Sequence, residues 1–566
     1  MEQPLVAPAR GPSWLRERRR VGSVRAGWAL LAAVAVLGYS RRGSPPPAAR
    51  VATALETPPV RQDSRVQTNG YSQFSLNLTS CAAVRKWMRE KHVGEDSLPK
   101  SVDIFVDADQ IEGSMGAQAS SGYFAFSLAR GDFLSGHINT SFVIVMDLLG
   151  NLQNVLIPPE TTQDNITGYF RIEGLKFHNA TALLLASNSR TIDHYFVWDW
   201  VNDAVEMLGD GVSGSSHDVQ HLPDTDTYLS ISSDFTYLIE WDARGRVVWN
   251  WTAPQWLTTA SVSGTHMNHA QQTEGDVIFV SARDLSSVFK VNKQSSSIEW
   301  VLGGKRGDFD IIDQNGDRYP RNTVFFHRQH NAEYIGHDQF IMFDNGVNVT
   351  ADPVYSSRLL VLTVNQSSDT ATVSWQFDTY ANSRIFGDAD RLPSGNVVAC
   401  YWPDTVFPNS KWERAEYEAV AIEVTESRDV AWWMGVKPHH EAWMGDSESY
   451  ARHDGEAPIG WAMYSVERMF QRPLVTNLQY DAAEQTLSFD MYNSHKEQFY
   501  AQATLDIKCG AVSLVHHADF APFWRPASVT KSISDLIEAD RDVEDCTLQV
   551  TNGWGQSATS GFSISS

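Results

Sequence analysis

Four segments of this chain repeat one pattern: three short apolar runs in succession, closed by a tryptophan. They span residues 228–251, 277–300, 340–375 and 397–432, and they recur at intervals of about fifty to sixty residues. Gly, Asp, Asn and Pro separate the runs, which is typical of short antiparallel strands. Two further segments, near residues 119–158 and 174–208, carry a weaker version. Six similar units of this size predict an all-β fold, a six-bladed β-propeller over residues 101–470.

A polar residue recurs at one position ahead of these units. Counting back eight residues from Asp226, Asp276, Asp338 and Asn396, which precede the first apolar runs, the sequence holds Asp218, Asn268, His330 and Asp388. In a propeller, equivalent positions of neighbouring blades face one central channel, so these side chains should meet there. Asp at such a position can also serve only to accept hydrogen bonds from backbone amides at a turn, and we expect that role for Asp218 and Asp388. Turn chemistry does not explain histidine.

Residues beyond the repeats form a second module. From residue 471 to 566 the sequence alternates polar and apolar residues in about five more strands, with the number and spacing of a small immunoglobulin-like β-sandwich. Cys509 and Cys546 both lie in it and could form a disulfide. Cys400 lies in an apolar run and is expected to be a buried thiol.

The N-terminus is of a different kind. Residues 1–42 combine several arginines with an apolar run at 26–39, as in a signal peptide or a short signal-anchor, and 43–100 is expected to be a partly disordered stalk or linker. A basic leader or an organelle transit segment is the alternative. Seven Asn-x-Ser/Thr acceptors agree with a glycoprotein of the secretory pathway, either anchored by one span with its C-terminus in the lumen or secreted: Asn77, Asn139, Asn165, Asn179, Asn250, Asn348 and Asn365.

Composition narrows the class of partner. The formal net charge is −23, which disfavours nucleic-acid binding, since that needs a basic surface. The polar positions instead gather His, Asn and Arg, a set suited to an anionic group undergoing transfer. Imidazole can act as nucleophile or proton carrier, while Arg and Asn hold anionic oxygens. A metal site is the chemical alternative, because His217 with His221 and His327 with His330 could serve as ligands.

The order and spacing of several motifs resemble the arylsulfotransferase family over roughly residues 115–470. These motifs are His217-Asp218, His266-x-Asn268, Ser281-Ala-Arg283, Leu302-Gly-Gly, Gln329-His330, Phe343-Asp-Asn-Gly and Arg391-Leu-Pro-Ser-Gly-Asn. The resemblance implies a six-bladed propeller that moves a sulfuryl group from an aryl sulfate to a phenolic acceptor, with no metal, no other cofactor and no nucleotide sulfate donor. Ala282 in place of a serine, Asn331 after the histidine, the basic leader and the C-terminal module depart from the bacterial pattern and suggest a divergent, eukaryotic-like member.

The same resemblance assigns roles. His330 would be the nucleophile and form a sulfohistidine in ping-pong kinetics, with His266 assisting proton transfer. Asn268 and Arg283 would hold sulfonate oxygens, and His217 would complete the pocket. A non-catalytic propeller that binds a ligand or a protein is the main alternative, and another hydrolase or lyase on the same scaffold is a third.

Overall fold

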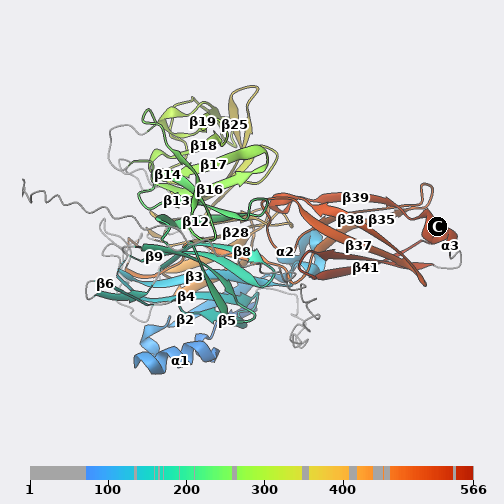
Figure 1. The fold of residues 1–566 in the computed structure, drawn as a ribbon, viewed down its shortest axis with the longest axis horizontal. Coiled ribbons are helices and arrows are strands. Elements are labelled where there is room, and N and C mark those ends of the chain that lie inside the picture. The colour runs from blue at the N-terminus through green and yellow to red at the C-terminus, as the bar shows by residue number, and fades with distance from the viewer. Residues whose placement is uncertain are drawn as a thin grey trace, which may run out of the picture. The chain divides into compact units, whose positions relative to one another are not determined.

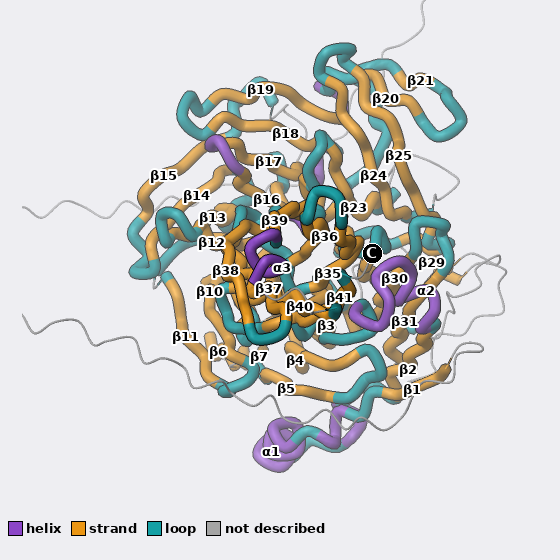
Figure 2. The backbone as a smooth tube through the Cα atoms, turned by 90° about the vertical axis from the view of Figure 1, so that its right-hand side faces the viewer, coloured by secondary structure: helices purple, strands orange, loops and turns teal. Residues whose placement is uncertain are grey.

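The computed structural model describes residues 72–132, 137–158, 160–163, 166–169, 171–189, 192–209, 211–257, 264–346, 356–403, 405–406, 417–437, 450–451, 459–539 and 544–564. The fold is mostly β, and almost all neighbouring strands run antiparallel. Between Ser72 and Met469 the larger sheets number six in this described part of the chain. Figure 2 shows them side by side around a common centre.

The six sheets follow one another along the chain, and the first and the sixth each add strands from the opposite end of this region (Figure 1). The first sheet is β33 (Ile459–Ala462), β3 (Tyr123–Asp132), β4 (His137–Asp147) and β5 (Leu152–Leu156), with β34 (Val466–Met469) also pairing with β3; the second is β8 (Arg171–Asn179), β9 (Ala182–Ser189), β10 (Ile192–Asp199) and β11 (Ala204–Leu208); the third is β12 (Gly214–Leu222), β13 (Thr227–Ser232), β14 (Tyr237–Asp242) and β15 (Val247–Thr252). The fourth is β16 (Met267–Thr273), β17 (Val277–Ala282), β18 (Ser287–Asn292) and β19 (Ser297–Leu302); the fifth is β22 (His330–Tyr334), β23 (Gln339–Asp344), β24 (Arg358–Asn365), β25 (Thr370–Asp378), β20 (Asp310–Ile312) and β21 (Arg318–Tyr319); the sixth is β27 (Asp388–Arg391), β28 (Val397–Tyr401), β30 (Ala419–Val424), β31 (Val430–Lys437), β2 (Ser101–Val106) and β1 (Ser72–Ser75).

The polar segments ahead of the apolar runs are themselves strands. β12, β16, β22 and β27 are the first strands of their sheets, and the predicted apolar runs supply the strands that follow. The turns between first and second strand share one feature in three sheets, since Asp226, Asp276 and Asp338 adopt left-handed φ values of 50°, 60° and 56°. Asp tolerates this conformation better than most residues, which explains why it recurs there.

Apolar side chains join neighbouring sheets all the way round. Each of six hydrophobic clusters combines residues of two consecutive sheets, and one of them joins the sixth sheet to the first. In that cluster Trp432 of β31 stacks on Phe124 of β3 with ring centroids 4.1 Å apart. Strands from both ends of this region complete the join, because β33 and β34 pair with β3 while β2 pairs with β31.

The predicted linker 43–100 includes structured residues from Ser72 onward. β1 extends the sixth sheet, and helix α1 (Ala82–Lys91) buries Val84 and Trp87, the latter against Phe142 at 5.5 Å. The apolar spacing of this short helix was not recognised in the sequence. Residues 43–71 lie outside the described ranges.

The remaining elements are small. They are the hairpin β6 (Glu160–Gln163) with β7 (Ile166–Tyr169), the sheet β26 (Ala381–Asn382), β29 (Thr405–Val406) and β32 (Tyr450–Ala451), the helices α2 (Ala108–Glu112) and α3 (Ser534–Ala539), and the 3₁₀ turns η1 (Leu78–Ser80), η2 (Glu95–Ser97), η3 (Gly113–Gln118), η4 (Glu274–Asp276), η5 (Arg283–Leu285), η6 (Gly304–Arg306) and η7 (Pro522–Trp524).

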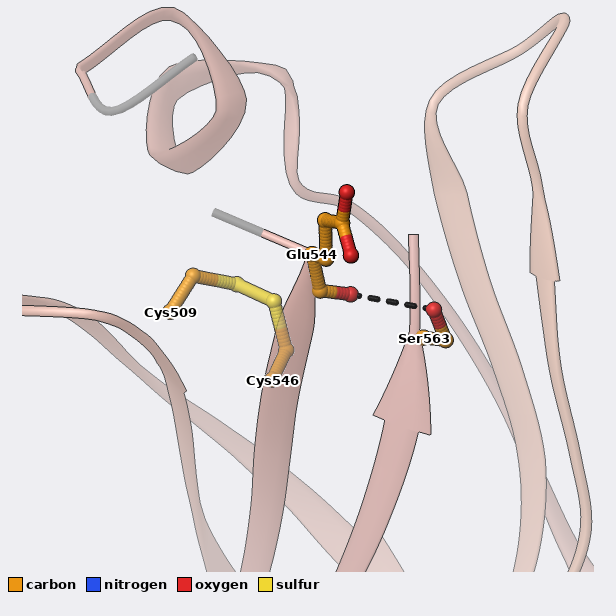
Figure 3. The surroundings of a disulfide bond; sticks show 4 residues. All are labelled: Cys509, Glu544, Cys546 and Ser563. Atoms are coloured by element: carbon orange, nitrogen blue, oxygen red, sulfur yellow. Dashed lines mark hydrogen bonds between the residues drawn. A yellow bond between two sulfur atoms is a disulfide. The ribbon is translucent and has the colours of Figure 1, made fainter. Parts of the chain in front are cut away.

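The C-terminal module has two sheets that share one apolar core. One sheet is β35 (Leu474–Asp481), β36 (Thr486–Tyr492) and β39 (Ala527–Ser532), and the other is β38 (Val512–Phe520), β37 (Ala501–Cys509), β40 (Asp545–Asn552) and β41 (Ser557–Ser563). Cys509 and Cys546 face each other across β37 and β40 and form the predicted disulfide (Figure 3). Cys400 is fully buried in β28, as predicted, and burial raises the pKa of its thiol.

Within the described ranges, the helices are all too short or too polar to cross a bilayer. The predicted signal-anchor at 26–39 lies outside them.

Candidate active site

His330 is the first residue of β22, and only 2% of its surface is exposed. Its Nδ1 lies 2.7 Å from Oδ1 of Asn345. Asn345 donates both of its amide hydrogens to backbone carbonyls, those of Ser383 and Phe386, each at 2.8 Å. The amide orientation is therefore set, and Oδ1 can only accept. Nδ1 of His330 must carry the proton, which leaves the lone pair on Nε2.

The charge state of His330 follows from its surroundings. Burial lowers the pKa of this imidazole well below its usual range, and the nearby Arg283 cation lowers it further. The hydrogen bond to Asn345 opposes these effects without overcoming them. At neutral pH His330 is thus an uncharged imidazole with a free lone pair on Nε2, the form that a nucleophile requires.

Gln329 and Asn268 hold the strand that carries His330. Nε2 of Gln329 donates to Ser281 Oγ and to the Ser287 carbonyl, both at 3.0 Å. The Gln329 carbonyl in turn accepts from Nδ2 of Asn268 at 2.8 Å. One amide hydrogen of Asn268 therefore helps to position the strand that carries His330. Its buried Oδ1 has no hydrogen-bond partner among the described residues.

His217 and His266 form a pair beside this strand. Their ring centroids are 5.6 Å apart, and His266 stacks on Phe235 at 4.8 Å. Burial, together with His217 and Arg283, lowers the pKa of His266 to about 3, so that His266 is neutral near pH 7. His266 is 27% exposed and can exchange protons with a ligand.

Glu173 of β8 orients His217, and sequence reasoning missed it. Its Oε2 lies 3.1 Å from Nδ1 of His217, and it also contacts Arg171 and Ser216. Burial alone would raise the pKa of Glu173, but Arg171 and His217 lower it below the usual range, so it is a carboxylate. Glu173 lies in a strand that also carries Arg171 and Lys176, so no local signal singled it out in the sequence.

Arg283 approaches from η5, directly after β17. Its backbone N donates to the His266 carbonyl at 3.0 Å, and its guanidinium pairs with Asp284 at 2.8 Å. Burial lowers the pKa of Arg283, yet an arginine remains cationic at neutral pH. It is the buried positive charge next to His330 and His266.

Tyr464 lies between the histidines. Its ring centroid is 5.6 Å from that of His217, 5.8 Å from that of His330 and 5.3 Å from that of Phe386. Tyr464 belongs to the connector between β33 and β34. The sequence did not single out Tyr464 as a site residue.

The five residues predicted from the sequence therefore share one site. His217 contacts His266, Arg283 bonds to the His266 backbone, Asn268 bonds to the residue before His330, and Tyr464 contacts both His217 and His330. A cavity of ≈ 20 Å³ adjoins them, with His217, Asn268 and Tyr464 in its lining.

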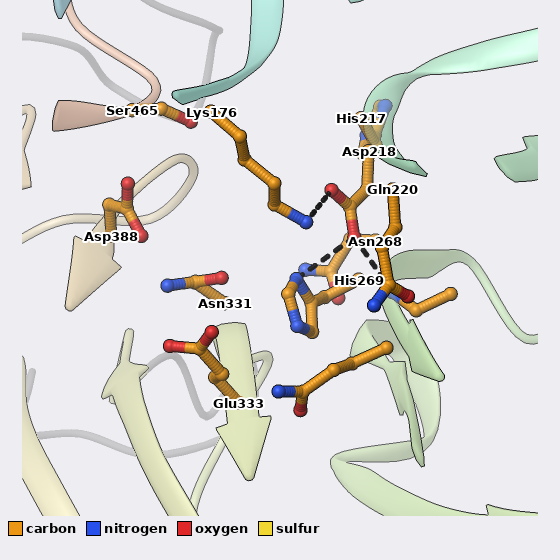
Figure 4. Close-up of polar contacts among 12 residues, drawn as sticks. Lys176, His217, Asp218, Gln220, Asn268, His269, Asn331, Glu333, Asp388 and Ser465 are labelled. Carbon is orange, nitrogen blue, oxygen red and sulfur yellow. Dashed lines mark hydrogen bonds and ion pairs between the residues drawn. The ribbon is translucent and has the colours of Figure 1, made fainter. Parts of the chain in front are cut away.

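Asp218 and Asp388 do accept hydrogen bonds from backbone amides, as predicted, but each accepts one from another sheet, and Asp388 also accepts from the adjacent Ala389 amide at 2.9 Å. Asp218 of β12 accepts from the Ala270 amide of β16 at 2.9 Å and pairs with Lys176 of β8 and His269 (Figure 4). Asp388 accepts from the Val466 amide of β34 at 3.0 Å. These aspartates tie separate sheets together instead of capping their own turns.

A second buried charged group lies further along β22. Lys496, from the loop between β36 and β37 of the C-terminal module, pairs with Glu333 at 3.0 Å and with Asp390 of β27 at 2.6 Å. Asp388 and Glu467 are buried nearby, and both add to its electrostatic surroundings. One lysine of the C-terminal module thus balances a group of carboxylates at the centre of the sheets.

Comparison with known proteins gives one family match. The model of the arylsulfotransferase family (ASST) matches residues 138–432, a range that includes all five predicted site residues. No curated protein sequence matches the chain significantly. Among solved structures, a protein of unknown function from Bacteroides caccae is 8% identical and covers 61% of this chain and 99% of its own, with a TM-score of 0.35. Virginiamycin B lyase from Staphylococcus aureus is 7% identical and covers 64% and 88%, with a TM-score of 0.32. The periplasmic gluconolactonase of Pseudomonas aeruginosa is 10% identical and covers 61% and 99%, with a TM-score of 0.30. The assignment rests on the family match alone.

Proposed function

Because this chain belongs to the arylsulfotransferase family, we propose that it transfers a sulfuryl group from a phenolic sulfate ester to a phenol through a sulfohistidine at His330. The single observation that carries the mechanism is the Asn345–His330 hydrogen bond, which leaves a neutral Nε2 as nucleophile beside the Arg283 cation. No nucleotide donor enters this scheme.

The first half-reaction forms the intermediate. The Nε2 lone pair of His330 attacks sulfur, the bond from sulfur to the phenolic oxygen breaks, and its electron pair stays on that oxygen. Arg283 and the second amide hydrogen of Asn268 hold the non-bridging oxygens, where a fixed cation stabilises the transferring group. The departing phenoxide takes a proton from solvent and leaves as a phenol.

The second half-reaction returns the enzyme to its starting state. A second phenol attacks the sulfur of sulfohistidine, the N–S bond breaks, and its electron pair returns to Nε2. We assign the phenolic proton to His266, which is neutral and partly exposed. His217, oriented by Glu173, completes the pocket wall. The two steps balance, since solvent supplies the proton that the first phenol gains and takes up the proton that His266 accepts from the second.

The same proposal covers the scaffold and the cell compartment. We propose that the six sheets are blades of a six-bladed propeller over 101–470, supported by the closed series of hydrophobic clusters, and that 471–566 is an immunoglobulin-like sandwich. The disulfide indicates an oxidising compartment. We therefore propose the secretory pathway, with residues 1–42 as its signal and the seven acceptors as sites of glycosylation.

The test uses the full chain with 4-nitrophenyl sulfate as donor and phenol as acceptor. We expect release of 4-nitrophenol, formation of phenyl sulfate and a labile sulfuryl adduct on His330, all lost in His330→Ala. His517→Ala, an exposed histidine of β38, is the matched control and should keep wild-type activity. Wild-type protein that transfers nothing from several aryl sulfates refutes the transferase proposal, and full activity in His330→Ala refutes the nucleophile. Activity lost on adding a chelator would instead favour the metal alternative.

A further inference from the structure

The hydroxyl of Tyr464 is a buried polar group with no hydrogen-bond partner among the described residues. A hydroxyl that is removed from water and left unbonded destabilises the fold, so such groups are rare in native proteins. Unsatisfied groups of this kind gather at sites where a ligand completes the bonding. Tyr464 lies at such a place, since both His217 and His330 contact its ring.

Two roles are open to a phenol beside a sulfohistidine. It could accept the sulfuryl group itself, or it could keep its proton and donate a hydrogen bond to a substrate oxygen. Burial, reinforced by the Glu173 carboxylate, raises the pKa of Tyr464 well above its usual value. The phenoxide that would attack sulfur is therefore disfavoured, and the protonated donor is favoured.

We propose that Tyr464 is a catalytic residue that donates its hydroxyl hydrogen bond to the phenolic oxygen of the aryl sulfate as the sulfur–oxygen bond breaks. The proposal rests on the sulfuryl-transfer function above. Negative charge builds on that oxygen in the transition state, and a donor that is already in place stabilises it without reorganisation. No proton needs to leave Tyr464 in this step.

The proposal explains a feature that packing alone does not. The ring of Tyr464 is held by Phe386 and the two histidines, but a phenylalanine would make the same ring contacts and leave no unsatisfied hydroxyl. Tyr417, a buried tyrosine of comparable environment, differs in that its hydroxyl donates to Asp103 at 2.9 Å. Tyr464→Phe and Tyr417→Phe therefore form a matched pair.

The experiment has a stability arm and a kinetic arm. Tyr464→Phe should melt at the same temperature as wild type or higher, while Tyr417→Phe should melt lower. In kinetics, Tyr464→Phe should lower kcat/KM for phenyl sulfate by about 10²-fold, the size seen when one such donor is removed. The loss should be clearly smaller for 4-nitrophenyl sulfate, whose leaving group carries less charge at oxygen. Tyr417→Phe should lower both rates by the same small factor.

The outcomes separate the two proposals. If wild type transfers no sulfuryl group from any donor, the proposed function fails and this role falls with it. If wild type is active and Tyr464→Phe loses nothing, or loses equally with both donors, only the role of Tyr464 is overturned. A sulfated Tyr464 peptide after incubation with donor alone would show that it is an acceptor, which also overturns the donor role.

Discussion

Lys496 provides a direct test of the charge balance at the centre of the sheets. Its side chain is 6% exposed, and those of its partners Glu333 and Asp390 are 1% and 2% exposed. Lys496→Met removes the cation but keeps most of the side chain's volume, so that the two carboxylates remain buried without it. Breaking a buried ion pair in this way costs about 3–5 kcal/mol. We expect a loss of this size in the free energy of unfolding at about pH 7.5.

The loss should shrink on acidification. In wild type, burial raises the pKa of Glu333, and Lys496 lowers it. The net effect is a pKa below the usual value. Glu333 therefore takes up no proton between about pH 7.5 and pH 5.5. Without the cation, only His269 and the Gln498 hydrogen bond oppose burial, so the pKa of Glu333 rises and the native variant binds a proton that the unfolded chain does not. Stability then rises by about 1.4 kcal/mol per pH unit for each such proton as pH falls.

Asp390 behaves differently in wild type. Burial already raises its pKa to about 6 in wild type, in spite of Lys496. Its contribution to stability therefore falls as pH rises from about 4, its unfolded value, through 6 in the native protein. In the variant the pKa of Asp390 rises further, because Lys496 no longer lowers it, so the difference between wild type and variant reports on both carboxylates. Over two pH units the Glu333 part of that difference is at most about 3 kcal/mol.

The measurement is urea unfolding at the two pH values for wild type, Lys496→Met and the control Lys508→Met, an exposed lysine of the same module. A loss below about 1 kcal/mol at pH 7.5 would refute the buried pairing, since that is the value of a surface pair. A loss of the expected size that does not shrink at pH 5.5 would refute its electrostatic origin. A second change, Asp390→Asn in the Lys496→Met background, should recover part of the stability by removing one of the uncompensated charges.

Three further outcomes follow from the structure. Asn345→Ala should lower kcat for 4-nitrophenyl sulfate by about 10–100-fold. ¹⁵N NMR should show that His330 no longer holds its proton only on Nδ1, and an unchanged tautomer would contradict the role given to Asn345. Cys509→Ala with Cys546→Ala should lower the free energy of unfolding by up to about 4 kcal/mol, because the bond closes a loop with a sequence separation of 37, and urea unfolding with and without reductant checks this. Expressed through the secretory route, the protein should shift to lower mass on treatment with an N-glycosidase, and no shift in any host that glycosylates would count against the glycoprotein proposal.

The repeat pattern predicted the sheets well because alternation and turn residues are local signals. The three apolar runs of each unit form strands. Asp226, Asp276 and Asp338 each lie in the turn between the first and second strand of their own sheet. The first strand of each sheet could not be predicted from the sequence in the same way. It carries polar site residues where a strand in an apolar core would carry Val or Ile, so its pattern is typical of a loop.

The sequence predicted those site residues that stand in recognisable motifs. The prediction missed residues whose role depends on contacts between sheets. His330 and Arg283 could be named from the sequence. Glu173 could not, because what matters is that it faces a histidine 44 positions further on, in the next sheet. Tyr464 was missed for the same reason: nothing in its neighbours along the chain shows that its hydroxyl has no partner.

One repeated position produces an asymmetric site because three of its four residues bind a neighbouring sheet. Asp218 accepts from the backbone of β16, Asn268 donates to the residue before β22, and Asp388 accepts from the backbone of β34. In the fifth sheet this link comes from Asn331, next to His330, which donates to the Ala389 carbonyl of β27. His330 departs from this rule, since its imidazole bonds to Asn345 of its own sheet. The residue proposed as nucleophile is thus the one member of the series whose side chain is not used to join sheets, which leaves Nε2 free for chemistry.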